Sequence, residues 1–273
     1  MTVTKLNTRR VAKPWGREEL WGPFTGDGER VGEIWYQDPA GRDLPLLIKY
    51  LFTSEKLSIQ VHPDDTAAQA IGQPRGKDEA WVILAAEPQS TIALGPKVTT
   101  SREELRAAAL DGGIEELLDW RPVKAGDVIY SRAGTVHAIG AGLTLIEVQQ
   151  NSDTTYRLYD YGRPRELHLD EGIPLSDPVP FVAPPLPGEV APGRELLVGE
   201  GGKFTLERWT GAGERRIEVG EEPTWLVQVA GESELNGHKV AAGECWLVEG
   251  DAKLTQDRGC ELLLARPKQQ AYS

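Results

Sequence analysis

The sequence predicts a mainly β protein made of two small β-barrels joined by a proline-rich linker. Three observations favour this fold class. The 273 residues include 30 glycines and 19 prolines, which is typical of a chain with many turns and few long helices. Apolar residues occur in short alternating or β-branched runs separated by turn residues. The glycine-turn texture of residues 124–139 recurs weakly in residues 231–248, which suggests an internal repeat.

The first half of the chain contains four expected strands and one short helix. The strands cover residues 46–52, 57–62, 79–85 and 90–94, each bounded by turn residues. Residues 64–72 begin with an aspartate of N-cap type and end on glycine, so a short helix is expected there.

Residues 101–120 are expected to form a small helical insertion. Ser101 is followed three residues later by Glu104, the spacing of a capping box, and leucines at helical positions surround a Gly-Gly break. Two short helices are therefore predicted. After them, three strands divided by glycine turns are expected between residues 126 and 150.

The expected domain boundary lies in a segment crowded with prolines. Residues 173–193 contain these prolines, which cannot sit inside a sheet and favour extended linkers. We therefore expect a metal-binding domain over residues 1–172, a linker over 173–193, and a second small β-barrel over 194–273.

Composition excludes several classes of protein. The formal net charge is −12 and no basic cluster is present, which argues against a nucleic-acid partner. No stretch approaches the ~18 to 20 uninterrupted apolar residues of a membrane span, and the first residues do not resemble a signal peptide. We expect a cytoplasmic protein. The cysteines, Cys245 and Cys260, form no metal-binding cluster and are expected to be small buried hydrophobes.

Four residues have the chemistry of a metal site. Side chains alternate along a strand, so Gln60 and His62 face the same way. Glu79 begins the next strand, and His137 follows a glycine turn. Two imidazoles, a carboxylate, a weaker fourth ligand and an open position are the ligand set of a catalytic zinc or similar ion. The alternative is that each is a hydrogen-bonded core residue or a surface residue.

A second group of polar residues lies between residues 147 and 163. Acidic, amide and hydroxyl groups are interleaved there with Arg157 and Arg163, whose guanidinium groups suit an anionic or phosphorylated ligand. An ion-paired sheet edge explains the same pattern equally well. Trp15 and Trp35, near the start of the chain, are expected to pack in the core.

Taken together, several blocks resemble the type I mannose-6-phosphate isomerases in their short bacterial form. The blocks span residues 11–170 and read KPWG, GEIW, LLIKYLF, LSIQVHPDD, GKDEAWVIL, RAGTVHAIG and IEVQQNSDTTYRLYDYGR. The resemblance implies a cupin fold with one Zn²⁺ per chain and the interconversion of D-mannose 6-phosphate and D-fructose 6-phosphate.

The resemblance also implies a role for each matching residue. The implied metal ligands are His62, Glu79 and His137, with Gln60 ranked fourth. Lys77 would transfer the proton, and Arg157 would be catalytic, with Asp153 beside it. Ser58 and Arg163 would bind the phosphate. A divalent cation and Arg157 would stabilise the negative charge of an enediolate. Lys77 could be the base, although a metal-bound water or a carboxylate could serve instead.

Two departures from the family pattern are visible. The Thr-His-Pro of longer family members, linked to sugar ring opening, is replaced by YQDPAG, so ring opening must use another group or occur in solution. The C-terminal half has no second ligand set.

Two alternative functions stay open: a non-catalytic sugar-phosphate-binding cupin, and an isomerase of another phosphosugar. A phosphosugar is the expected partner of either, and the chain is expected to be a monomer or a weak homodimer.

Overall fold

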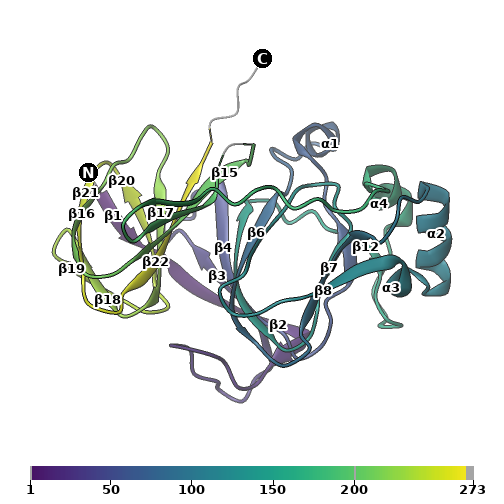
Figure 1. Ribbon diagram of the computed structural model, residues 1–273, viewed down its shortest axis with the longest axis horizontal. Helices are drawn as coiled ribbons and strands as arrows, with labels where there is room; N and C mark the ends of the chain where they lie inside the picture. Colours follow the sequence, from purple (N-terminus) through teal and green to yellow (C-terminus); the bar gives the residue numbers. More distant parts are fainter. Residues whose placement is uncertain (1, 200, 269–273) are drawn as a thin grey trace.

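Short strands with frequent turns dominate the computed structural model, which describes residues 2–199 and 201–268 (Figure 1). The strands form four antiparallel sheets. The glycine and proline content predicted such a β-rich chain with many turns. The mainly β fold class is therefore confirmed.

Two of the sheets contain most of the strands between residues 7 and 159. The six-stranded sheet has the order β2 (Asn7–Arg17), β3 (Val31–Gln37), β4 (Leu46–Phe52), β11 (Leu143–Gln150), β6 (Glu79–Ala86) and β9 (Val128–Ser131). The five-stranded sheet has the order β12 (Tyr156–Tyr159), β5 (Ile59–Val61), β10 (His137–Ile139), β7 (Thr91–Pro96) and β8 (Leu118–Pro122).

The other two sheets come mainly from the C-terminal part of the chain. The seven-stranded sheet has the order β1 (Thr2–Lys5), β20 (Cys245–Glu249), β17 (Thr224–Ala230), β22 (Glu261–Pro267), β15 (Phe204–Thr210), β14 (Arg194–Val198) and β13 (Gly188–Ala191). The four-stranded sheet has the order β16 (Gly213–Ile217), β21 (Ala252–Gln256), β18 (Glu232–Leu235) and β19 (His238–Ala241).

The sheets are stacked in layers, with the six- and seven-stranded sheets packed face to face at the centre (Figure 1). Every residue of β4 is buried because both of its faces are covered. On one face Tyr50 and Phe52 join an apolar cluster that includes Trp225 of the seven-stranded sheet. On the other face Leu51 packs with Trp81 in a cluster shared with the five-stranded sheet. This second interior is the one that receives the polar side chains of the site.

The helices are short and lie at the edge of the layered core (Figure 1). They are α1 (Asp65–Ala70), α2 (Arg102–Asp111), α3 (Ile114–Leu117) and α4 (Leu169–Leu175). The last three cover the outer face of the five-stranded sheet, where Leu105 and Ile173 share an apolar cluster with Val61. Among the described residues, no helix is both long enough and apolar enough to span a membrane.

Several local predictions are confirmed. The strand predicted at residues 46–52 is β4, and the expected strands at 57–62, 79–85 and 90–94 are β5, β6 and β7 with small shifts at their ends. Asp64 caps α1 by accepting a hydrogen bond from the Ala67 amide, and Ser101 and Glu104 form the predicted capping box of α2. These features depend on neighbouring residues alone, which is why the sequence was sufficient to predict them.

The expected boundaries need three corrections. The helical insertion ends at Leu117, because the next residues pair with β7 as strand β8. Residues 2–5 pair with β20, so the first strand belongs to a C-terminal sheet. The expected linker, residues 173–193, contains the end of α4 and strand β13. The local sequence of a strand does not predict which distant strand it pairs with. Positions 1, 200 and 269–273 of the expected domains lie outside the described residues.

Candidate metal centre and active site

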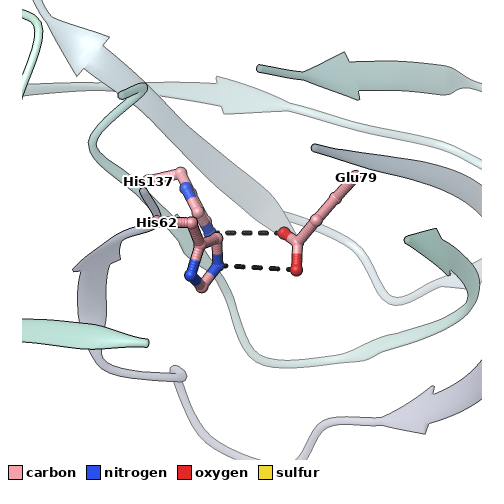
Figure 2. A group of neighbouring side chains, drawn as sticks. All are labelled: His62, Glu79 and His137. Carbon is pink, nitrogen blue, oxygen red and sulfur yellow. Dashed lines mark ion pairs between the residues drawn. The ribbon is translucent and has the colours of Figure 1, made fainter. Parts of the chain in front are cut away.

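Three metal-ligating side chains converge between the five- and six-stranded sheets. His62 directly follows β5, His137 begins β10 and Glu79 begins β6. His62 Nε2 lies 3.4 Å from Glu79 Oε1, and His137 Nε2 lies 3.5 Å from Glu79 Oε2. Figure 2 shows both imidazole rings facing the carboxylate. One ligand atom from each residue lies within 4.8 Å of the others, so the group could hold a metal ion.

Backbone carbonyl groups orient both imidazoles. His62 Nδ1–H donates to the Thr154 carbonyl oxygen at 3.0 Å, and His137 Nδ1–H donates to the Thr135 carbonyl oxygen at 2.9 Å. Because Nδ1 carries the proton, Nε2 of each ring is unprotonated and lies near the Glu79 carboxylate. Metal-binding histidines commonly have this arrangement, in which a second hydrogen bond fixes the tautomer and the ring.

The three side chains are also in the protonation states that a metal requires. Burial, reinforced by the Lys77 ammonium, lowers the pKa of His62 to about 3, and burial also lowers the pKa of His137. Burial raises the pKa of Glu79, but the Lys77 cation and His62 outweigh it and hold that pKa well below its ordinary value. Neutral imidazoles beside a carboxylate can bind a cation without first losing a proton.

The carboxylate of Glu79 is incompletely satisfied by protein groups. Neither of its buried oxygens receives a hydrogen bond of good geometry from a described residue. Its nearest cation is Lys77, whose Nζ lies 2.7 Å from Oε1 and 3.3 Å from His62 Nε2. A buried carboxylate without hydrogen bonds is costly unless a cation compensates it. The donor set therefore fits a divalent metal ion.

Gln60 lies beside this group, as the alternation along β5 predicts. Its Nε2 is 3.4 Å from His137 Nε2, and its Oε1 accepts a hydrogen bond from Ser58 Oγ at 3.2 Å. A half-turn of the amide would present the oxygen in place of the nitrogen.

A cavity of about 330 Å³ lies next to the metal-binding group. Its volume is in the range of small-molecule sites. Five of its lining residues carry cationic side chains: Lys13, Lys49, Lys77, Arg157 and Arg165. The other lining residues are Trp15, Glu33, Trp35, Leu51, Leu57, Ser58, Gln60, Glu147, Asp153 and Thr155. Three of these residues are carboxylates, so the lining carries a surplus of cations, and such a surface suits an anionic ligand that also carries hydroxyl groups.

A buried ion pair of Lys49 and Glu147, to which no sequence motif gave a role, borders this cavity. Lys49 Nζ lies 3.0 Å from Glu147 Oε1 and donates to Gln149 Oε1 at 2.6 Å, while Trp81 Nε1 donates to the other Glu147 oxygen at 3.1 Å. Lys49 is the one charged residue in the apolar run of residues 46–52, and Glu147 is the one charged residue of residues 143–150; that pattern was the available signal.

The predicted site residues are not all brought together. Ser58, Gln60, Lys77, Asp153 and Arg157 line the cavity or adjoin the metal-binding group. The expected phosphate ligand, Arg163, is not among the lining residues. The other histidines, His168 and His238, lie apart from the metal-binding group: His168 precedes α4, and His238 begins β19 and packs on Trp246. Trp15 packs in the core as predicted, whereas Trp35 is half-buried beside the cavity.

Comparisons with known proteins point to one family. The family model "Phosphomannose isomerase type I, catalytic domain" matches residues 26–100. Mannose-6-phosphate isomerase ManA of Bacillus subtilis is 42% identical over 163 residues, which are 55% of this chain and 51% of ManA. The mannose-6-phosphate isomerase of Streptococcus mutans is 44% identical over 47% of this chain and 42% of its own length. The chain thus spans about half the length of these two relatives.

Other relatives match over a larger part of their length. "Putative mannose-6-phosphate isomerase YvyI" of Bacillus subtilis is 30% identical over 88% of this chain and 74% of YvyI. The crystal structure of the mannose 6-phosphate isomerase from Bacillus subtilis matches with a TM-score of 0.82 at 26% identity, covering 97% of this chain and 99% of that chain. The structure of "a putative mannosephosphate isomerase from Archaeoglobus fulgidus" matches with a TM-score of 0.74 over 98% of both chains. At 19% identity, it supports the fold alone.

Proposed function

Since the chain belongs to the type I mannose-6-phosphate isomerase family, we propose that it is a zinc-dependent isomerase that interconverts D-mannose 6-phosphate and D-fructose 6-phosphate. The observation that carries the proposal is the convergence of His62, Glu79 and His137 beside a cavity with five cationic side chains. The first feature provides for a metal, and the second provides for a phosphorylated sugar.

The metal would be held by His62, Glu79 and His137, with Gln60 as the fourth protein ligand. Two nitrogen donors and a carboxylate suit zinc, and a further position stays open when few protein ligands are used. When bound, a zinc ion would supply positive charge that polarises the substrate carbonyl and stabilises a developing oxyanion. The oriented Nε2 atoms and the unsatisfied oxygens of Glu79 support this assignment.

The reaction moves one proton between neighbouring carbon atoms of the open-chain sugar. A base removes the proton from C2 of the aldose, which gives an enediolate, and the same proton is returned to C1. The O2 hydroxyl proton moves to O1, so that C2 becomes the carbonyl carbon of the ketose and no atom is lost. Lys77 is the proposed proton-transfer residue, because its Nζ lies beside the metal ligands and its side chain lines the cavity.

Arg157 is the proposed stabiliser of the enediolate. Its Nη1 donates to the Glu166 carbonyl oxygen at 2.7 Å, whereas its buried Nε has no hydrogen-bond partner among the described residues. The Arg157 side chain lines the cavity, where a guanidinium group suits an anionic oxygen. Asp153 and Ser58, on the same cavity, are the proposed orienting group and phosphate ligand, respectively.

The proposal also assigns different roles to the N-terminal and C-terminal parts of the chain. We assign the metal chemistry to the part that contains the five- and six-stranded sheets, and a structural role to the C-terminal barrel. Among the residues that the structure describes, the His62 group is the one cluster of histidine, cysteine and acidic side chains suited to a metal, which supports this division.

A coupled isomerase assay with mannose 6-phosphate tests the activity. Turnover should disappear on chelation and return with Zn²⁺, and metal analysis should give about one zinc ion per chain. A metal-loaded protein that binds the sugar phosphate without turnover would instead be a binding protein. Faster turnover of another phosphosugar, such as ribose 5-phosphate, would identify a different isomerase.

A further inference from the structure

The loop after β12 carries two arginines, and the one expected to bind phosphate is already engaged by the protein. Arg163 lies 2.8 Å from Asp160 Oδ1 through Nη2, which also donates to the Lys56 carbonyl oxygen at 2.9 Å. Its guanidinium carbon lies 5.4 Å from the centre of the Tyr161 ring. These contacts hold Arg163 away from the residues that line the cavity.

The second arginine, Arg165, lines the cavity together with Ser58 and Arg157. The carboxylate of Asp160 binds it with two hydrogen bonds, from Nε at 2.6 Å and from Nη2 at 2.7 Å. The Asp160 side chain is 1% exposed, whereas that of Arg165 is 29% exposed. A buried carboxylate therefore holds this guanidinium in one orientation, and its Nη1 makes no hydrogen bond to the described residues.

We propose that Arg165 binds the phosphate group of the sugar phosphate, and that Asp160 is a positioning residue that holds Arg165 in place. This inference rests on the proposed function, because it names the residue that recognises one end of the proposed substrate.

The charges around the cavity support this assignment. A phosphate ester carries close to two negative charges and three acceptor oxygens near neutral pH. Arg165 offers Nη1 on the cavity that Ser58 also lines. Burial lowers the pKa of the neighbouring Arg157, and the Arg165 and Arg163 cations lower it further, so positive charge is concentrated around this loop. A dianion bound at Arg165 would offset part of that charge.

Steady-state kinetics of single variants test the proposal. R165A should raise the KM for mannose 6-phosphate about 10- to 100-fold with little change in kcat, because a charge-assisted contact far from the reacting carbons is lost. R165K should recover part of this loss, and D160N should raise KM by a smaller factor. R163A should change KM by less than a third of the R165A factor. R106A is the control for loss of one positive charge, because Arg106 lies on α2 and pairs with exposed Asp170.

Binding of inorganic phosphate and fructose 6-phosphate, measured by calorimetry, separates this inference from the proposed function. If R163A weakens binding and raises KM as much as R165A does, the inference is wrong even though the enzyme is an isomerase. If the wild-type protein has no turnover but binds phosphate at least 10-fold more tightly than R165A, the inference holds and the isomerase proposal fails. Absence of phosphate and sugar-phosphate binding to wild type overturns the inference. Should R165A not fold, R165Q replaces it in every comparison.

Discussion

Replacing Lys49 by methionine should strongly destabilise the fold. Lys49 lies on β4 directly opposite Glu147 on β11, and both side chains are 6% exposed. Methionine keeps most of the apolar stem but removes the charge. The Glu147 carboxylate would then remain buried with Trp81 Nε1 as its hydrogen-bond donor, and the contact of the ammonium with the Trp35 ring, at 4.8 Å, would also be lost.

The expected loss follows from the buried, unpaired carboxylate. Removing one partner of a buried ion pair costs about 3–5 kcal/mol. In a chain of this size, that loss corresponds to a fall of about 6 to 20 °C in Tm. Burial and the Glu79 charge already raise the pKa of Glu147 above its ordinary value of 4.5, and removal of Lys49 should raise it further. A raised folded-state pKa adds stability below the unfolded pKa and loses it as the pH rises, so the defect should be larger near about pH 8 than near about pH 5.

Denaturant unfolding, followed by tryptophan fluorescence and circular dichroism, measures the effect. The double variant K49M/E147Q should recover most of the stability, because no uncompensated charge remains. The control is K253M, which removes an exposed ion pair with Glu214 and should leave the free energy of unfolding unchanged within error. A loss below about 1 kcal/mol for K49M, or no recovery in the double variant, would refute the reasoning.

Three further predictions concern the metal group and its supports. H137A should lower the bound metal from about one ion per chain to near zero by elemental analysis, while H238A retains it; equal metal contents would contradict the ligand assignment. D65N should cost roughly 1–3 kcal/mol at pH 7, because Asp65 accepts hydrogen bonds from Lys203 and from the Gly76 amide. The folded-state pKa of Asp65 is below its ordinary value of 3.8. The stability difference between D65N and wild type should therefore shrink as the pH falls below 3.8 and Asp65 becomes protonated. A stability difference that stays constant with pH would refute the role of the Asp65 charge. G76A should weaken metal binding in a competition assay, since its Cβ would lie 2.6 Å from the Pro63 carbonyl oxygen and displace the segment that leads to Glu79. G220A, where a Cβ meets no atom within 4 Å, is its control, and equal affinities would contradict the prediction.

Much of the fold was predictable because its signals are local. The Ser101 capping box and the Asp64 cap each depend on backbone amides only three residues away. The boundaries of β4 follow from an apolar run that ends at turn residues. In contrast, the pairing of residues 2–5 with β20 depends on a partner more than 240 residues along the chain. The isolated strand offers no information about that partner.

In the candidate site, too, local features were predictable from the sequence and long-range contacts were not. The alternation of side chains along β5 is sufficient to predict that Gln60 and His62 share a face. Residue type and strand position marked Glu79 and His137 as candidate ligands, motif resemblance added Lys77, and the structure brings Glu79 and His137 against His62. The structure also selects Arg165 over Arg163 at the cavity, although the two residues are almost adjacent in sequence and chemically identical.

The sequence by itself determined which residues could bind a metal, and that Gln60 and His62 share one face of their strand, because residue type and strand periodicity are local properties. Tertiary structure decided which of those residues meet. His62 and Glu79 come together because two sheets pack face to face, and Arg165 faces the cavity because buried Asp160 orients it. The charge of Lys49 is tolerated in an apolar strand because Glu147 lies opposite it, 98 residues along the chain. These arrangements are set by long-range packing and by the cost of leaving buried charges unpaired, neither of which a local sequence pattern encodes.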